Sequence, residues 1–158
     1  MSMNRREALR ASGGYGILGA FVAAGVITPQ EALAQQAAWN KAAFETKDTN
    51  ATVKALGGDT AATSDKITVT GPDIAENGAV VPVGATTTLP NVTLIAMLVE
   101  KNPNMMAASF VIGPDTEPFI TTRVKMGQSS NVMALVRSDG KFFVAQKEIK
   151  VTLGGCGG

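Results

Sequence analysis

The fold of this chain is decided near its C-terminus by the stretch VMALVRSDGKFFVAQKEIKVTL, residues 132–153. Two predicted strands, residues 132–137 and 141–153, flank Asp139-Gly140, a pair that favours the two-residue turn of a β-hairpin. Over residues 149–153 apolar and polar side chains alternate, which is the period of a half-buried strand. The sequence therefore predicts a hairpin whose last strand continues to residue 153.

Further short strands are predicted upstream of this hairpin, with polar turns between them: residues 66–70, 79–88, 92–100, 107–112 and 119–126. No helical pattern separates them, and Asn77-Gly78 is a strong turn signal. Such a series predicts a mainly β chain whose residues 65–153 form an immunoglobulin-like antiparallel β-sandwich. Because Pro82 cannot donate a ladder hydrogen bond, its strand is predicted to lie at a sheet edge or to be bulged there.

Residues 35–64 differ from the strands in composition and are predicted to form a short helical segment before the sandwich. Trp39, Ala43 and Phe44 share one face of the first helical turn, and residues 50–56 form a second one. Gly57-Gly58 ends this segment, since glycine readily takes the left-handed conformation found after helix C-termini.

The composition excludes most familiar enzyme chemistry. The chain has 158 residues, 14 Lys and Arg against 13 Asp and Glu, a formal net charge of +1, no His and one Cys. A balance this close to neutral predicts no nucleic-acid binding. Without His there is no catalytic triad, Cys-His dyad or imidazole ligand, and one Cys makes neither an intrachain disulfide nor a metal-binding cluster. We expect one domain with no catalytic residue, no metal and no cofactor.

Residues 1–34 are typical of an export signal. Arg5 and Arg6 precede a weakly apolar run over residues 11–27, and Ala32 and Ala34 supply the small residues of a cleavage site. Paired arginines favour the twin-arginine pathway, which exports folded proteins. We expect cleavage after Ala34, location in the periplasm and no stable membrane association afterwards. A cytosolic protein with an amphipathic N-terminal helix and a retained membrane anchor are the alternatives.

The chain ends in Gly154, Gly155, Cys156, Gly157 and Gly158, directly after the last predicted strand. Glycine loses the most conformational entropy on ordering, so residues 154–158 are predicted to be a flexible arm that reaches ~17 Å at ~3.3–3.6 Å per residue. The glycines leave the Cys156 thiol sterically bare, and no His lies near it in the sequence to activate it. Such a thiol is suited to modification by partner enzymes rather than to catalysis.

Three other functions compete with that of a carrier whose thiol is modified by partner enzymes. A cysteine enzyme needs a nearby base to form the thiolate, and the chain has no His to supply one. A thiocarboxylate carrier would use the Gly157-Gly158 carboxylate, but such carriers are cytosolic and are activated by ATP. The main alternative is a non-catalytic periplasmic immunoglobulin-like binding module with an incidental tail thiol.

Five methionines invite a copper site, because thioethers bind Cu(I). They are scattered over several predicted strands without His or Cys nearby, so we predict that they fill the core: Met97, Met105, Met106, Met126 and Met133.

The sequence resembles the SoxY family of sulfur-carrier subunits over essentially the whole mature chain. Three stretches carry the resemblance: KVTLGGCGG at residues 150–158, PDIAENGAVVPV at residues 72–83 and LVEKNPN at residues 98–104. The twin-arginine leader is a further similarity. Leu153 departs mildly from the family pattern, in which Ile or Val is more usual.

The resemblance implies a carrier that forms a heterodimer with SoxZ in the periplasmic thiosulfate-oxidising system. It implies that the haem enzyme SoxAX joins thiosulfate oxidatively to Cys156, giving an S-thiosulfonate. The dimanganese hydrolase SoxB would then release sulfate and leave a persulfide, which SoxCD, where present, would oxidise in place. The chain itself would be no enzyme, and its contacts with SoxAX, SoxB and SoxCD would be transient.

Overall fold

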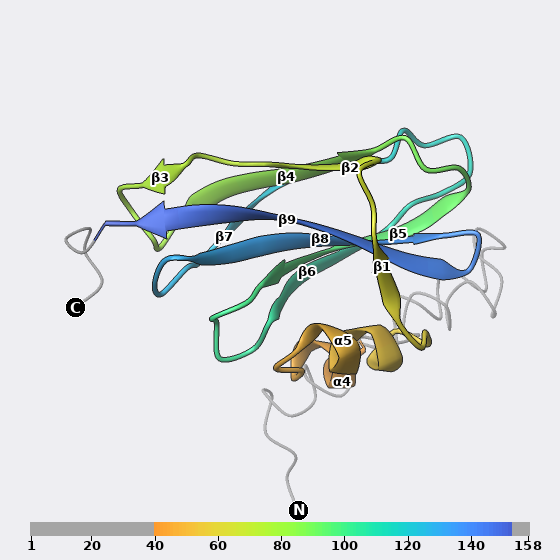
Figure 1. The fold of residues 1–158 in the computed structure, drawn as a ribbon, viewed down its shortest axis with the longest axis horizontal. Helices are drawn as coiled ribbons and strands as arrows, with labels where there is room; N and C mark the ends of the chain where they lie inside the picture. The colour runs from red at the N-terminus through yellow and green to blue at the C-terminus, as the bar shows by residue number, and fades with distance from the viewer. Residues whose placement is uncertain (1–39, 153–158) are drawn as a thin grey trace, which may run out of the picture. The chain divides into compact units, whose positions relative to one another are not determined.

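Residues 40–152 are described by the structure, a computed structural model, and they form two β-sheets and two short helices (Figure 1). The large sheet has the order β1-β9-β8-β5-β6, with β3 also paired to β9. Its strands are β1 (Ala61–Thr63), β3 (Ile74–Ala75), β5 (Val92–Val99), β6 (Met106–Val111), β8 (Ser130–Ser138) and β9 (Lys141–Val151). The small sheet, in the order β2-β4-β7, contains β2 (Ile67–Thr70), β4 (Val81–Thr87) and β7 (Phe119–Val124). The mainly β sandwich is confirmed.

The β8–β9 hairpin forms where the sequence predicts it. Ser138 pairs with Lys141, and the two residues between them, Asp139 and Gly140, have φ angles of 48° and 75°. Positive φ at both positions is what a type I′ turn requires, and this turn matches the twist of the two strands. β9 ends at Val151, two residues before the predicted end of the strand.

Two short strands depart from the antiparallel pattern. β1 and β3 both run parallel to β9, β1 beside its first half and β3 beside its end. β1 lies within residues 35–64, the predicted helical segment, and extends the large sheet instead. At three and two residues these strands are too short to show an alternating pattern in the sequence.

The central strands of the large sheet are buried on both faces. In β5, Ile95 and Met97 point into the core between the sheets, while Leu94 and Leu98 point into a second core on the other face. The second core includes Val53 of helix α5, so the helices cover the outer face of the large sheet. Burial on two sides explains why β5 and β8 are continuous apolar runs rather than alternating ones.

Helices α4 (Lys41–Phe44) and α5 (Thr49–Ala55) confirm the helical segment. Asp48 caps α5 by accepting a 2.7 Å hydrogen bond from Ala51 N. α5 stops where predicted: Gly57 has a φ of +87°, and Gly58 N donates to Val53 O at 2.9 Å. The predicted partner Trp39 lies outside the described residues. Within residues 40–152 no helix has the length and apolar character needed to cross a membrane.

The expectation that Pro82 lies in an edge strand is wrong, and the strand pairing shows why a proline is tolerated there. β4 is the middle strand of the small sheet, but β2 ends at Thr70, which pairs with Gly84. Pro82 therefore pairs only with Arg123 of β7 and has no ladder partner on its other side. The strand is central, and only the segment that contains the proline is a local edge.

The five methionines singled out for copper are confirmed as core residues. Met97 and Met126 lie between the sheets, whereas Met105, Met106 and Met133 lie under the helices. None of the five is more than 8% exposed.

Candidate functional site

The residues that the sequence predicts to act lie outside the part of the chain that the structure describes. They are Cys156 with its neighbours Gly154, Gly155, Gly157 and Gly158, and the export residues Arg5, Arg6, Ala32 and Ala34. The structure does describe the three residues to which the tail is attached, Lys150, Val151 and Thr152. We refer to these three residues as the arm root.

Backbone hydrogen bonds hold the arm root on one side through the segment that contains β3. Lys150 N donates to Asp73 O at 2.9 Å, and Thr152 N donates to Ala75 O at 3.1 Å. This second bond lies one residue beyond the end of β9. Pairing with β3 therefore secures the chain up to the last described residue.

Ser129 holds the arm root on the opposite side. Regular pairing between β8 and β9 ends with Ser130 opposite Ile149. Beyond it, Val151 N donates to Ser129 Oγ at 2.9 Å, and the same hydroxyl donates to Val151 O at 3.5 Å. A side chain thus continues the ladder where the neighbouring strand has stopped.

Gly78 brings a third segment close to the arm root. Its carbonyl oxygen accepts a 2.7 Å hydrogen bond from Met126 N. A Cβ atom at position 78 would overlap the Met126 carbonyl oxygen and would lie 2.9 Å from Val151 Cγ1. Only glycine allows the two backbones and Val151 to approach this closely.

The turn between β5 and β6 joins the same end of the sandwich. Lys101 N donates to Ser130 Oγ at 3.0 Å, and Asn102 Nδ2 donates to Lys125 O at 2.7 Å. Three segments that are far apart in sequence therefore meet at this end: residues 72–83, residues 98–104 and the arm root. Figure 1 shows β3 and the end of β9 side by side at this end.

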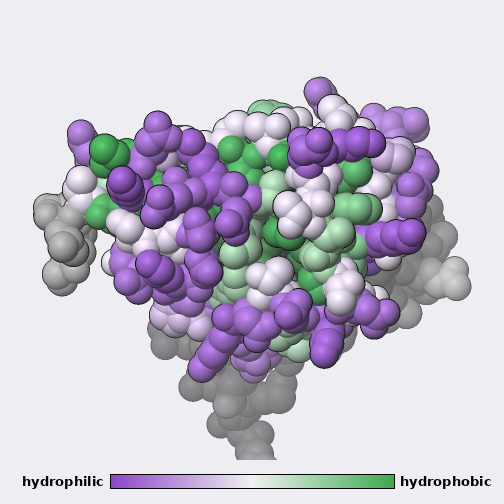
Figure 2. Space-filling view, in the orientation of Figure 1, coloured by the Kyte–Doolittle hydropathy of each residue, from purple (hydrophilic) through white to green (hydrophobic). Residues whose placement is uncertain are grey.

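Polar side chains surround the last part of β9. Figure 2 shows mainly hydrophilic residues over this part of the face, and a paler area nearer to β1. Gln146, Glu148 and Lys150 occupy exposed positions of the strand. Lys147 Nζ lies 2.6 Å from Asp73 Oδ1 and forms an ion pair between β9 and the segment that leads into β3. The Lys147 hydrogen bond, and then its positive charge, lower the pKa of the exposed Asp73 carboxyl.

Lys147→Met is expected to raise the pKa of the Asp73 carboxyl toward its ordinary value of about 3.9. Because the folded-state pKa is lowered, the ion pair stabilises the fold at pH values above the ordinary pKa. Its contribution is lost as the pH falls through the lowered folded-state pKa. A carbon-detected NMR titration of the Asp73 carboxyl measures the change. Lys150→Met is the matched control, and equal pKa values in the wild type and Lys147→Met would contradict the assignment.

Comparison with known proteins adds a decisive observation. The family model described as "SoxY: Sulfur oxidation protein SoxY" matches residues 52–156, which is more than half of the chain. The chain belongs to the SoxY family. The matched region starts within α5, covers the sandwich and the arm root, and ends at Cys156, the sole cysteine of the chain.

A solved SoxY structure supports the same assignment. The sulfur carrier protein SoxY from Chlorobium limicola f thiosulfatophilum is 35% identical to this chain, with a TM-score of 0.58. The similarity covers 64% of this chain and 93% of that protein. The mainly β, SoxY-like fold is therefore shown by structure as well as by sequence.

Two superoxide reductases are less similar. The neelaredoxin from Ignicoccus hospitalis is 22% identical with a TM-score of 0.49, over 55% of this chain and 80% of that one. The enzyme from Nanoarchaeum equitans is 12% identical with a TM-score of 0.48, over 57% of this chain and 100% of that one. No curated protein matches the sequence.

The sequence did not reveal how the arm root is held. Ser129, Ala75 and Gly78 are separated from the arm-root residues that they contact by 22 or more residues. Ser129 forms two hydrogen bonds with Val151, Ala75 accepts one from Thr152, and Gly78 only approaches Val151 closely. The sequence signal that could have pointed to these contacts is the stretch at residues 72–83, which carries the family resemblance and contains both Ala75 and Gly78.

Proposed function

We propose that this chain is the sulfur carrier of a Sox system for thiosulfate oxidation, with Cys156 as the attachment point. The observation that carries the proposal is the SoxY family match, which extends to residue 156 and so includes the only thiol of the chain. The 35% identical relative is named as a sulfur carrier protein, which supports the same role. The chain would be a covalent substrate carrier rather than an enzyme.

The chemistry proposed for Cys156 begins with two steps. In the first, the thiol and thiosulfate form a sulfur–sulfur bond, giving an S-thiosulfonate, one proton and two electrons, which the haem partner SoxAX accepts. In the second, SoxB catalyses attack by water on the terminal group, which releases sulfate and two protons and leaves a persulfide anion. SoxCD, where present, would oxidise the remaining sulfane sulfur before a second hydrolysis. No step requires a base from this chain.

The described fold suits this role because it fixes the place from which the tail emerges. The arm root is held by Asp73 and Ala75 on one side and by Ser129 on the other. We propose that motion is confined to the tail, residues 154–158, whose glycines leave the backbone unrestricted. Cys156 lies four residues beyond Thr152, so at ~3.3–3.6 Å per residue the cysteine would search a volume of at most about 13–14 Å radius around that fixed point.

The proposal extends to the whole chain. Residues 1–34 would be a twin-arginine signal that is removed on export to the periplasm, residues 35–64 the lead-in and residues 65–153 the sandwich. The partner would be SoxZ in a heterodimer, with transient contacts to the Sox enzymes. Export of a folded protein without a cofactor motif favours a partner acquired before export.

Intact mass spectrometry of the protein from the periplasm tests attachment and processing together. We expect the mass of residues 35–158, increased by one thiosulfate-derived group after incubation with thiosulfate and the Sox enzymes. A thiol reductant should remove the added mass, because the group is held through a sulfur–sulfur bond. A binding module with an incidental thiol would show no such increase. An unmodified mass after incubation with active enzymes would therefore contradict the carrier.

A further inference from the structure

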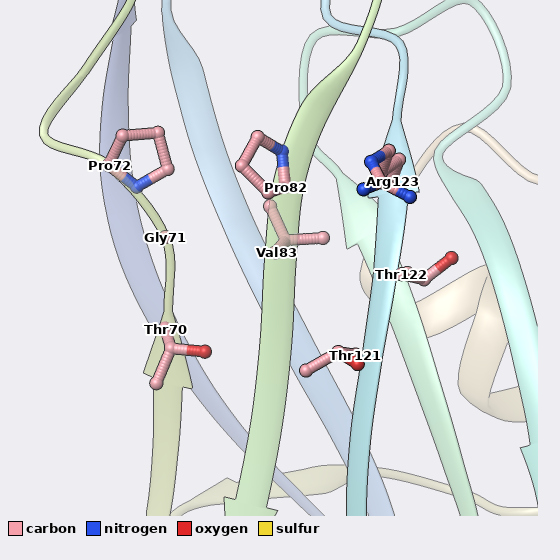
Figure 3. Close-up of a pocket in the computed structure, with 8 residues that line it drawn as sticks. All are labelled: Thr70, Gly71, Pro72, Pro82, Val83, Thr121, Thr122 and Arg123. Carbon is pink, nitrogen blue, oxygen red and sulfur yellow. The ribbon is translucent and has the colours of Figure 1, made fainter.

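The outer faces of the two sheets differ in chemistry. Figure 3 shows the outer face of the small sheet, where Thr70, Thr121 and Arg123 help to line an open groove of about 470 Å³. Polar side chains of this kind can face water, so no helix is needed over them. The outer face of the large sheet carries apolar side chains instead, and Leu94 and Leu98 are buried there beneath the helices. Their burial requires that α4 and α5 stay in place.

Helices α4 and α5, which we call the helical cover, are lightly attached to the large sheet. With four and seven residues, both are too short to be stable helices in water without packing. The hydroxyl groups of Thr46 and Thr52 lie 2.6 Å apart and hold the segment after α4 to α5. Ala43 and Val53 are the fully buried apolar side chains that the cover adds to the second core, and both are small. An element held in this way opens locally at a lower free energy than the strands beneath it.

Two methionine sulfurs lie where the helical cover meets the sheet. Thr49 Oγ1, at the start of α5, lies 3.6 Å from Met133 Sδ and 3.9 Å from Met105 Sδ, which are hydrogen-bond distances for sulfur. The single proton of this hydroxyl can be donated to either sulfur. Met105 N also donates a 2.9 Å hydrogen bond to Thr46 O. Contacts between the cover and the sheet therefore converge on these two thioethers.

We propose that Met105 and Met133 form a reversible oxidation site for peroxides, and that their oxidation releases the helical cover from the large sheet. The site is separate from Cys156, and the inference does not rest on the sulfur chemistry proposed for that residue. Met97 and Met126 lie in the core between the sheets, where an oxidant arrives only if the sheets separate. Local opening of the cover would expose Met105 and Met133 without that separation.

The chemical step is the transfer of one oxygen atom. The peroxide oxygen–oxygen bond breaks, a sulfur–oxygen bond forms, and the peroxide leaves as water or an alcohol while the sulfur is oxidised by two electrons. The product, methionine sulfoxide, is polar, so burying it again in an apolar core is unfavourable. An oxygen on the side of the sulfur that faces Thr49 would also occupy the space of the hydrogen bond. Reduction by a dithiol restores the thioether and yields a disulfide and water, so the cover can close again.

Peptide mapping of the full chain after limited treatment with hydrogen peroxide tests the selectivity of the site. The Cys156 thiol is first capped with N-ethylmaleimide, so that it does not consume the oxidant. We expect Met105 and Met133 to gain one oxygen at least about ten-fold faster than Met97 and Met126, because opening the cover costs less than separating the sheets. All four side chains are at most 8% exposed, which makes the slower pair an internal control. Equal rates at the four sulfurs would contradict the proposal, since they would indicate oxidation through global unfolding.

Amide exchange at Val53 measures the release of the cover. Peroxide treatment of the wild type should speed this exchange at least about ten-fold and leave exchange at Ile95, in the middle of β5, unchanged. The double variant Met105→Leu, Met133→Leu keeps the volume of both side chains but cannot be oxidised at these positions, so its exchange at Val53 should not respond.

The matched control is the double variant Met97→Leu, Met126→Leu, which should respond to peroxide as the wild type does. Loss of the response in this control too, or unchanged exchange at Val53 in an oxidised wild type, would overturn the proposal. Because peptide mapping needs the wild type alone, the proposal stays testable even if a double variant fails to fold.

Discussion

Cys156→Ser is expected to abolish thiosulfate-dependent turnover in a reconstituted Sox system. The serine oxygen cannot replace sulfur in a disulfide-type linkage, so neither the S-thiosulfonate nor the persulfide can form. The free energy of unfolding should change by no more than about 0.5 kcal/mol, because position 156 lies in the tail beyond the strand that the sandwich holds. Turnover is measured as sulfate released, and stability by chemical denaturation of the same preparations.

Retained binding to SoxZ is the internal control for Cys156→Ser. A variant that binds its partner, unfolds at the wild-type denaturant concentration and releases no sulfate isolates the chemistry of the thiol. Wild-type turnover by this variant would end the carrier proposal. A variant that failed to bind its partner would instead show that the tail contributes to the interface.

Gly78→Ala is expected to destabilise the fold by about 1–3 kcal/mol, the usual cost of overpacking a closely packed site. The new methyl group would overlap the Met126 carbonyl oxygen and press on Val151. Because the obstacle is backbone rather than the end of a flexible side chain, either the hydrogen bond from Met126 N to Gly78 O or the position of the arm root must change. Denaturant midpoints and amide exchange at Val151 and Thr152 measure the two effects.

Gly127→Ala is the matched control for this prediction. Gly127 follows Met126 in the sequence, yet an added Cβ atom would meet no atom within 4 Å. The change should leave the unfolding free energy within about 0.5 kcal/mol of wild type, as surface substitutions usually do. Equal effects of Gly78→Ala and Gly127→Ala on the unfolding free energy would show that the close approach at Gly78 leaves room for a side chain.

The sequence predicted those parts of the fold that depend on local chemistry. Asp139-Gly140 favours one turn type, and Gly57-Gly58 ends a helix, because both depend on a few adjacent backbone angles. The central strands were predicted as short segments between polar turns, although their burial on both faces emerged only from the structure.

The parts that escaped prediction depend on contacts between distant residues. Pro82 was expected at a sheet edge, but the central strand β4 tolerates it because the neighbouring strand β2 ends before it reaches Pro82. The ion pair between Asp73 and Lys147 joins residues 74 positions apart. For the candidate site, the sequence identified the thiol through its uniqueness and its glycine neighbours. It gave no sign that Ser129 and Ala75 hold the strand from which that thiol extends.

The double anchoring of β9 has a mechanical consequence. Under the proposed function an enzyme captures the tail, and a pull on the tail along the direction of β9 loads this strand along its axis. Ladder hydrogen bonds run across the strands, so a force in this direction shears them together instead of opening them one at a time. β9 resists along its whole contact with β8, and β3 adds resistance at the point where the force enters. Under the proposed function, repeated capture and release of the tail should therefore leave the hydrogen bonds at the end of β9 intact.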